Sequence, residues 1–356
     1  VVAVIWVGAE QADSGIITQG KVIALVNYMS QILVELIKMA NLIIIISKAV
    51  ACMNRVDSIF KVESSIEDKG RHGSRKPGSQ NSGSQNSGSQ NPGPQNSGPQ
   101  NPALRIPKVE FKDMEFVYAG AKEPALKDIS FCAMAGQTIG VIGGTGSGKS
   151  TLVNLIPRFY DAASGQVLVD GTDVKEYSLD ELRDKTGVVP QKSVLFKGTL
   201  RDNMRWGKQD ASDEEIYRAL DTAQAREFVD SKGEGLDLYI DQGGHNLSGG
   251  QRQRLTIARA LVRRPEILIM DDSASALDFA TDARLRKAIR ENTGDMTVFI
   301  VSQRATTIKS ADTILVLDEG RLAGMGTHKE LLKDCQVYRE ICLSQLSKEE
   351  VERDEQ

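Results

Sequence analysis

The pattern of apolar residues divides the chain into a long helical segment, a polar stretch without periodicity, and a region of alternating strands and helices. Residues 1–7 are apolar, residues 8–20 are polar with glycines, and a helical pattern without proline runs from residue 21 to about residue 61. At about 1.5 Å per residue this helix extends roughly 60 Å, about twice a bilayer core of about 30 Å. The pattern therefore predicts a helix long enough to cross a membrane and project beyond it.

Polar residues recur along this predicted helix at intervals of three and four, which places them on one face. They are Asn27, Gln31, Glu35, Lys38 and Asn41. Charge inside a membrane is costly and normally faces a bundle interior or a wet cavity. We expect this stripe to line a transport pathway or a helix–helix contact. A soluble amphipathic helix or coiled coil is the alternative, but the four isoleucines at residues 43–46 favour a membrane span.

The polar stretch consists of pentapeptide repeats. Residues 73–102 form six of them, the first reading GSRKP and the others variants of GSQNS. Gly, Ser, Gln, Asn and Pro cannot bury a core, so the repeats are typical of a flexible linker. The linker separates the membrane segment from the rest of the chain.

After residue 106 the pattern becomes that of a globular domain. Strands are predicted at residues 109–118, 128–134, 137–142, 166–171, 267–270, 297–301 and 313–317, and helices at residues 152–159, 178–185, 212–229, 255–262 and 278–292. Continuous apolar runs such as residues 267–270 are expected of buried parallel strands. The alternation predicts an α/β domain with a mostly parallel sheet.

Composition narrows the class of protein. The chain has 44 basic and 48 acidic residues, a net charge of −4, and no basic stripe, so we expect no nucleic-acid partner. None of its four cysteines forms a C-x-x-C pair, which indicates reduced thiols facing a cytosol. The chain begins with Val1 rather than Met and has no signal-peptide pattern, so we expect it to be part of a longer protein.

One glycine-rich loop has the spacing of a phosphate-binding loop, G-x-x-x-x-G-K-[ST]. It reads Gly143, Gly144, Thr145, Gly146, Ser147, Gly148, Lys149, Ser150, Thr151. Glycines let backbone amides surround phosphate oxygens, and the helix start adds partial positive charge. Lys149 would reach the β- and γ-phosphates, and the Ser150 hydroxyl would bind Mg²⁺. The loop alone does not separate a transporter motor from a kinase or a GTPase.

A second helix start, Leu247, Ser248, Gly249, Gly250 and Gln251, precedes residues 255–262 and has Ser248 as its expected N-cap. Together with the phosphate loop, Gln191, residues 267–272 and residues 275–278, it resembles the Walker A, Q-loop, signature, Walker B and D-loop motifs of the ATP-binding cassette (ABC) family. The resemblance extends over about residues 109–346. The preceding segment resembles the last one or two transmembrane helices of an ABC exporter half.

The resemblance implies the fold and the domains. It implies an α/β P-loop NTPase nucleotide-binding domain with a helical subdomain, preceded by one or two transmembrane helices. Residues 1–61 would then be the end of a transmembrane domain, 62–107 a linker, 108–346 the nucleotide-binding domain and 347–356 a charged tail. Two such domains would dimerise head to tail, with each ATP held between one domain's phosphate loop and the other's signature.

The resemblance also implies residue roles. Tyr118 would stack on adenine, and Gln191 would contact Mg²⁺ and sense the membrane domain. Asp271 would hold Mg²⁺. The signature residues would close over the γ-phosphate of the partner's ATP. Ser275 and Asp278 belong to the D-loop, through which Asp278 would communicate across the dimer.

Two positions depart from the family pattern. Asp272 stands where the family usually has the Glu that polarises the attacking water, and Gln303 stands where it usually has His. Asp272 is one methylene shorter than Glu, and Gln303 cannot carry a proton or a positive charge. With an intact signature, this combination resembles one subunit of a heterodimeric exporter that hydrolyses ATP slowly at its own site. A fully active homodimeric exporter and a regulatory module without turnover are the alternatives.

Other classes fit less well. A soluble ABC protein of DNA repair or translation would need a long coiled coil between the Walker A and signature motifs, and residues 151–247 hold none. The signature excludes a P-loop kinase or GTPase. The resemblance suggests export of drugs or lipids and names no cargo. It implies a multi-pass protein of the cell membrane with a cytoplasmic nucleotide-binding domain, with Lys48 and Arg55 marking the cytoplasmic side.

Overall fold

The computed structural model describes residues 1–61, 66, 106–273 and 277–355. The predicted linker repeats, residues 73–102, therefore lie outside the described residues. The chain divides into two compact units, Val1–Glu67 and Asp68–Gln356, and each is described by itself.

The N-terminal unit is a pair of helices, α1 (Val2–Asp13) and α2 (Gln19–Phe60). They pack where Gly8 meets Val22, since a Cβ on Gly8 would lie 2.6 Å from Val22 Cγ1. Small residues at such contacts let two helices approach closely. Helix α2 matches the predicted helix and is long and apolar enough to cross a membrane. Two residues of its polar stripe, Glu35 and Lys38, form an ion pair of 2.8 Å.

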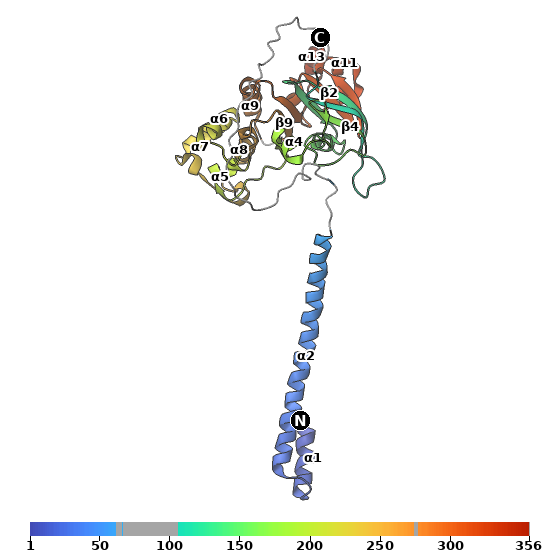
Figure 1. The fold of residues 1–356 in the computed structure, drawn as a ribbon, viewed down its shortest axis with the longest axis vertical. Coiled ribbons are helices and arrows are strands. Elements are labelled where there is room, and N and C mark those ends of the chain that lie inside the picture. The colour runs from blue at the N-terminus through green and yellow to red at the C-terminus, as the bar shows by residue number, and fades with distance from the viewer. Residues whose placement is uncertain (62–65, 67–105, 274–276, 356) are drawn as a thin grey trace, which may run out of the picture. The chain divides into compact units, whose positions relative to one another are not determined.

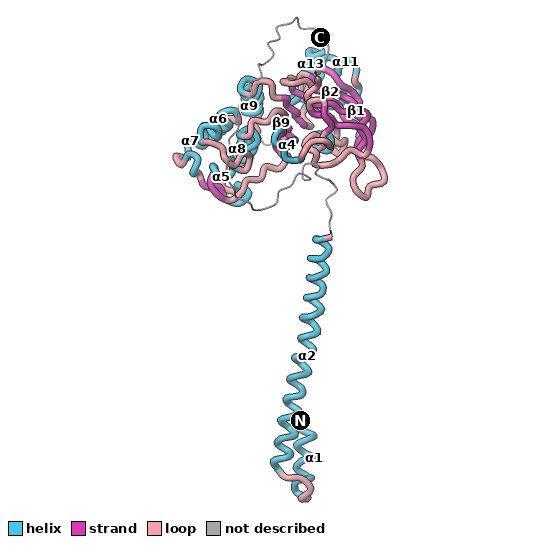
Figure 2. The backbone as a smooth tube through the Cα atoms, in the orientation of Figure 1, coloured by secondary structure: helices cyan, strands magenta, loops and turns pink. Residues whose placement is uncertain are grey.

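The C-terminal unit is built on a six-stranded sheet in the order β12-β11-β3-β10-β9-β6, in which only β12 is antiparallel to its neighbour. Figure 2 shows the strands of this unit in magenta and its helices in cyan. The strands of the six-stranded sheet are β3 (Thr138–Gly143), β6 (Thr186–Val189), β9 (Ile267–Asp271), β10 (Thr297–Val301), β11 (Thr313–Asp318) and β12 (Arg321–Gly326). Along β9, Ile267 and Ile269 face one hydrophobic core while Leu268 and Met270 face another. Burial on both faces explains why such a strand is apolar at every position.

A second, antiparallel sheet has the order β2-β1-β4-β5. Its strands are β1 (Val109–Phe116), β2 (Leu126–Ala133), β4 (Ser164–Val169) and β5 (Thr172–Asp173), and a short pair joins β7 (Gly198–Thr199) to β8 (Tyr239–Ile240). The sequence pattern predicted three of these strands without indicating that they form a sheet of their own. The alternation of apolar and polar residues along a strand indicates which face of the strand is buried, but it does not indicate which other strands pair with it.

The helices cover the parallel sheet and form a lobe beside it. They are α3 (Lys149–Asn154), α4 (Leu179–Lys185), α5 (Leu200–Arg205), α6 (Asp213–Thr222), α7 (Arg226–Ser231), α8 (Gly249–Val262), α9 (Phe279–Asn292), α10 (Ala305–Ile308), α11 (His328–Asp334), α12 (Gln336–Gln345) and α13 (Lys348–Glu355). Figure 1 shows α5 to α8 gathered on one side of the unit, with β2 and β4 on the other. The expected charged tail includes α13, whose Val351 is buried.

Two predicted helices differ from the structure. Residues 212–229 form α6 and α7 rather than one helix, because Gln224 between them has φ 55°, a left-handed conformation that ends a helix. The helix predicted over residues 152–159 begins earlier and ends at Asn154. Pro157 offers no backbone N–H to continue it, and Arg158 has φ 52°.

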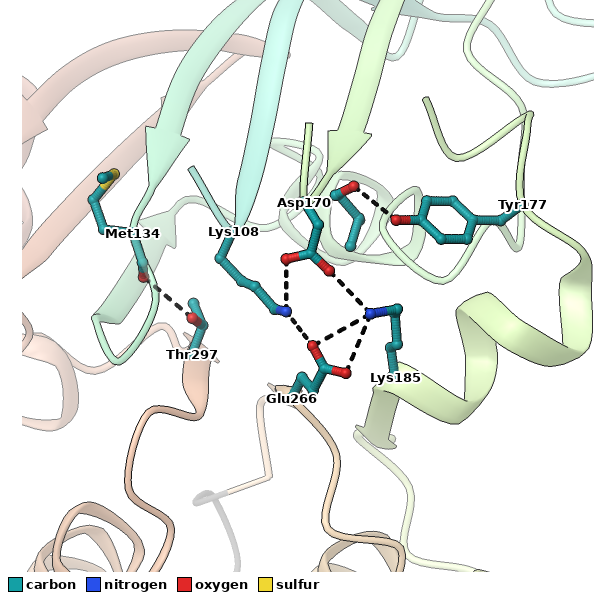
Figure 3. A network of polar contacts seen from close by, with 8 residues as sticks. Lys108, Met134, Asp170, Tyr177, Lys185, Glu266 and Thr297 are labelled. Atoms are coloured by element: carbon teal, nitrogen blue, oxygen red, sulfur yellow. Dashed lines mark hydrogen bonds and ion pairs between the residues drawn. The ribbon is translucent and has the colours of Figure 1, made fainter. Parts of the chain in front are cut away.

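Four charged residues join the two sheets. Lys108, just before β1, donates to Asp170 at 2.7 Å and also to Glu266, while Lys185 at the end of α4 contacts Asp170 at 3.1 Å and Glu266 at 3.2 Å (Figure 3). Burial opposes ionisation of Asp170, but hydrogen bonds from both lysines outweigh it and lower its pKa. The hydrogen bond from Lys108 is the main cause of the lowered pKa of Glu266.

We expect Lys108→Ala to lower the free energy of unfolding by about 1–2 kcal/mol, because it leaves two carboxylates with one lysine in partly screened surroundings. The loss should lower the melting temperature by about 2–6 °C. Since the pKa values of Asp170 and Glu266 are lower in the folded chain, the stabilisation is present above about pH 4 and disappears as the pH falls through the folded values.

Thermal unfolding of the full chain in detergent at pH 7 and at pH 3 measures this effect. Lys112→Ala is the matched control, because Lys112 pairs with Glu110 on the same strand while half exposed. An equal loss of melting temperature in both variants would contradict a special contribution from the network.

Candidate nucleotide-binding site

The phosphate-binding loop connects the end of β3 to the start of α3, as predicted. Gly143 packs against the backbone of β11, where a Cβ would lie 2.1 Å from the Leu317 carbonyl oxygen. Gly148, which precedes α3, has φ 97°, and a Cβ there would lie 2.6 Å from Leu126 Cδ2. Both positions therefore require glycine, and the loop is held closely against two neighbouring strands.

Lys149 is buried beneath this loop. Its Nζ donates to the carbonyl oxygens of Gly143, at 3.0 Å, and Gly144, at 2.6 Å. Burial lowers the pKa of Lys149, and the charges of Asp272 and Asp271 oppose that shift. The ammonium group is thus held against two carbonyl oxygens of the loop, and Lys149 lines the cavity in which phosphate oxygens would lie.

Ser150 and Asp271 bring oxygen ligands together beside the loop. Ser150 Oγ at the start of α3 donates to Asp271 Oδ1 at the end of β9, at 2.9 Å. Burial raises the pKa of Asp271, and Ser150 opposes the shift. The amide of Gln191 faces the same cavity. Hydroxyl, carboxylate and amide oxygens are ligands that Mg²⁺ accepts alongside water and phosphate, so these residues fit that ion.

The two residues that depart from the family pattern line the same cavity, which has a volume of about 400 Å³. Asp272 follows β9 with φ 45°, and its Oδ2 accepts a hydrogen bond of 3.3 Å from Gln191 Nε2. Aspartate adopts this left-handed backbone more readily than glutamate does. Gln303, which follows β10, lies on the cavity wall with Val301.

Tyr118 lies at the edge of the cavity within an aromatic cluster. Its ring meets Phe116 edge-on with centroids 4.7 Å apart and Tyr160 with centroids 5.4 Å apart. Its hydroxyl lies 2.8 Å from Thr151 Oγ1, which ties it to the phosphate-loop helix. Tyr160 was not predicted as part of the site. It lies outside the sequence motifs, and the fold brings it beside Tyr118.

We expect Tyr118→Ala to weaken ATP binding about 5- to 150-fold, because stacking of a base on an aromatic ring is worth about 1–3 kcal/mol. Tyr118→Phe should keep ATP affinity within about threefold, since it keeps the ring and loses only the contact with Thr151. Equilibrium binding of a fluorescent ATP analogue to the full chain measures both. If the two variants bind equally weakly, the hydroxyl rather than the ring matters.

The signature residues are arranged as predicted at the start of α8. Ser248 Oγ accepts from the Gln251 N–H at 3.2 Å, while Gln251 Oε1 accepts from the Ser248 N–H at 3.0 Å, a complete capping box. Leu247 is buried beneath it, and Ser248 and Gly249 are exposed. None of the signature residues lines the cavity beside the phosphate loop among the described residues. Figure 1 shows α8 within the lobe of α5 to α7.

The predicted D-loop is described only in part. Ser275 lies outside the described residues. Asp278 is the N-cap of α9, where its Oδ1 accepts from the Thr281 N–H at 2.9 Å. This bond is the main cause of the lowered pKa of Asp278. The structure thus gives Asp278 a capping contact, and its communication across a dimer stays a prediction.

A strand, a glycine loop, a buried lysine and a hydroxyl–carboxylate pair at one end of a parallel sheet define a P-loop nucleotide-binding domain. The family model for ABC transporters matches residues 126–275 of this chain. An uncharacterized ABC transporter ATP-binding protein of Mycobacterium tuberculosis is 39% identical over 347 residues, which is 97% of this chain and 55% of that protein. This chain belongs to the ABC transporter family.

Two further similarities concern exporters. The ATP-dependent lipid A-core flippase of Haemophilus influenzae is 43% identical over 240 residues, 67% of this chain and 41% of that protein. The structure of a bacterial Atm1-family ABC exporter with ATP bound matches with a TM-score of 0.65 and 38% identity, over 69% of this chain and 44% of that one. The chain spans about half the length of the curated relatives it matches.

Proposed function

We propose that this chain is the ATP-binding and ATP-hydrolysing subunit of an ABC exporter, with ATP and Mg²⁺ as its cofactors. One observation carries the proposal. The chain has two helix starts suited to a phosphate, at Lys149 and at Gly249, and the second lies outside the cavity that holds the first. In a head-to-tail complex with a second ABC half-transporter, the partner's signature would cover the ATP in this chain's cavity. The signature of this chain would cover the ATP bound by the partner.

We infer further that the chain's own site turns over slowly and that the partner is a different subunit. Asp272 carries a shorter side chain than Glu and is already hydrogen-bonded to Gln191. Its carboxylate would therefore be held away from a water that a glutamate would reach. A misplacement of about 1 Å can slow a reaction about a hundredfold. Gln303, unlike histidine, cannot become a cation beside the departing phosphate.

Two other functions remain as candidates. A fully active homodimer would hydrolyse ATP at two equal sites that use Asp272. A regulatory module would bind ATP at Lys149 without turnover. The exporter subunit is favoured over the module because the signature helix start is complete, with its capping box formed and its glycine exposed.

The membrane part of the proposal concerns α2 and the cargo. We propose that α1 and α2 belong to a multi-pass transmembrane domain in the cell membrane, with the nucleotide-binding unit in the cytoplasm. The polar stripe of α2 would face other helices or the cargo, because its pair Glu35–Lys38 is too costly to expose to lipid. Lipids are a proposed cargo by analogy with the relative named as a lipid A-core flippase. Drugs are a proposed cargo by analogy with a Bacillus subtilis protein named as a putative multidrug export ATP-binding/permease protein, which is 42% identical over 233 residues, 65% of this chain and 40% of that protein.

ATP hydrolysis by the full-length protein in lipid nanodiscs tests the proposal. The protein should bind Mg²⁺-ATP alone and hydrolyse it rapidly only after a second half-transporter is added. Rapid hydrolysis without that subunit would favour the homodimer. If the protein binds ATP but hydrolyses none of it, even when each half-transporter encoded next to it has been added in turn, the regulatory module is favoured.

A further inference from the structure

A glutamine near the end of the chain holds the backbone beside Gln303. Gln345, in the last turn of α12, donates from Nε2 to the carbonyl oxygen of Gln303 at 2.7 Å. Its Oε1 accepts from the backbone N–H of Ala305 at 2.9 Å. One side-chain amide thus binds two backbone groups that flank Arg304, 42 and 40 residues earlier in the chain.

The orientation of this amide follows from its partners. A backbone N–H can only donate and a carbonyl oxygen can only accept, so the oxygen of Gln345 must face Ala305 and its nitrogen must face Gln303. Ala305 is the first residue of α10 and is fully buried. Its N–H is one of the helix-start donors that have no partner within a helix, and the N-cap residue does not cap it with its side chain. Gln345 fills that place.

The held segment leads directly from the sheet to the nucleotide cavity. The Ser302 hydroxyl, just after β10, accepts from the Arg304 N–H at 3.0 Å. Two side chains, those of Ser302 and Gln345, therefore bind one backbone group in each of residues 303, 304 and 305. Gln303, between them, lines the cavity with Asp271 and Asp272. Holding the carbonyl of Gln303 limits rotation of its backbone, and this restricts where its side chain can lie.

We propose that Gln345 is a positioning residue for ATP hydrolysis, which keeps Gln303 in place toward the γ-phosphate position. This inference rests on the proposed ATP-hydrolysing function. It gives the C-terminal helices a part in the reaction, because a shift of α12 would change the backbone of the segment that lines the site. Gln345 itself does not line the cavity.

The test compares Gln345→Ala and Gln345→Glu in the full-length protein bound to a partner subunit whose own site has been inactivated, so that only hydrolysis at this chain's cavity is measured. Gln345→Ala should slow single-turnover hydrolysis about tenfold at saturating ATP and change ATP affinity less than about twofold. It should also speed amide exchange at Ala305 about fivefold or more, because the buried N–H loses its acceptor. Gln345→Glu keeps an acceptor for Ala305 but turns an oxygen toward the Gln303 carbonyl. It should slow hydrolysis as much as alanine does, with Ala305 exchange near the wild-type rate.

Gln336→Ala is the matched control, since Gln336 lies on the same helix and its amide donates to the exposed Glu340. It should leave hydrolysis and Ala305 exchange unchanged. A wild-type hydrolysis rate in Gln345→Glu, or a parallel loss of ATP affinity, hydrolysis and melting temperature in Gln345→Ala, would overturn the positioning role. If the wild-type pair hydrolyses no ATP, the proposed function fails, and Ala305 exchange still decides whether Gln345 holds this segment.

Discussion

Gly249→Asp in this chain should reduce ATP turnover of the assembled exporter about a hundredfold or more. In the proposed arrangement the start of α8 faces the γ-phosphate of the partner's ATP. A carboxylate there would repel the phosphate and remove the favourable end of the helix dipole from it. The fold should tolerate the change, because Gly249 is exposed and acidic residues stabilise the first turn of a helix.

Steady-state hydrolysis by the two-subunit protein in nanodiscs measures the loss. ATP binding at this chain's own phosphate loop should stay within about twofold, because Lys149 and Ser150 lie in a different cavity from Gly249. Gln336→Asp is the matched control, since it adds a carboxylate at the exposed first residue of another helix, α12. Turnover that survives Gly249→Asp would exclude a role for this signature in the active site.

The double substitution Asp272→Glu with Gln303→His should raise hydrolysis at this chain's own site about tenfold or more. It restores a longer carboxylate and a group able to carry charge beside the γ-phosphate. Glutamate must then adopt the left-handed backbone that Asp272 has, with φ 45°, and this should lower stability by about 1 kcal/mol. The rate is measured by single-turnover hydrolysis with the partner's own site inactivated.

The single change Asp272→Ala completes the test. In the wild-type pair it should reduce total turnover less than about twofold, because the faster chemistry occurs at the partner's phosphate loop. If Asp272→Ala abolishes turnover as fully as removal of the partner's Walker B glutamate, the two sites are equal. The proposal of an exporter with two unequal sites would then be wrong, and the fully active homodimer would be the better proposal.

Features that depend on residues close together in the chain were predicted well. Strand β10 has the predicted bounds, and Ser248 is the N-cap of α8 as expected. Each is decided within a few residues, by continuous apolar burial or by a side chain that reaches the third N–H of its own helix. The phosphate loop belongs to the same group, because its glycine spacing alone indicates a backbone that can surround an anion.

Other helix boundaries were predicted less well, because they depend on the left-handed backbone of a single residue, which the spacing of apolar residues does not indicate. The break between α6 and α7 depends on the backbone of Gln224, which carries no glycine or proline signal. Apolar spacing continues through it, so the pattern predicts a single helix. Arg158 ends the turn after α3 in the same way. A left-handed residue at such a position is set by how the following segment must pack.

The sequence by itself identified the class of protein, the phosphate loop and the long apolar helix, because each of these depends on residues that are close together in the chain. The folded chain established which distant groups meet. Tyr160 lies beside Tyr118, Lys108 reaches Glu266 across 158 residues, and Gln345 holds the segment that carries Gln303. Contacts of this kind depend on how sheets and helices pack against one another, and no local periodicity encodes that packing.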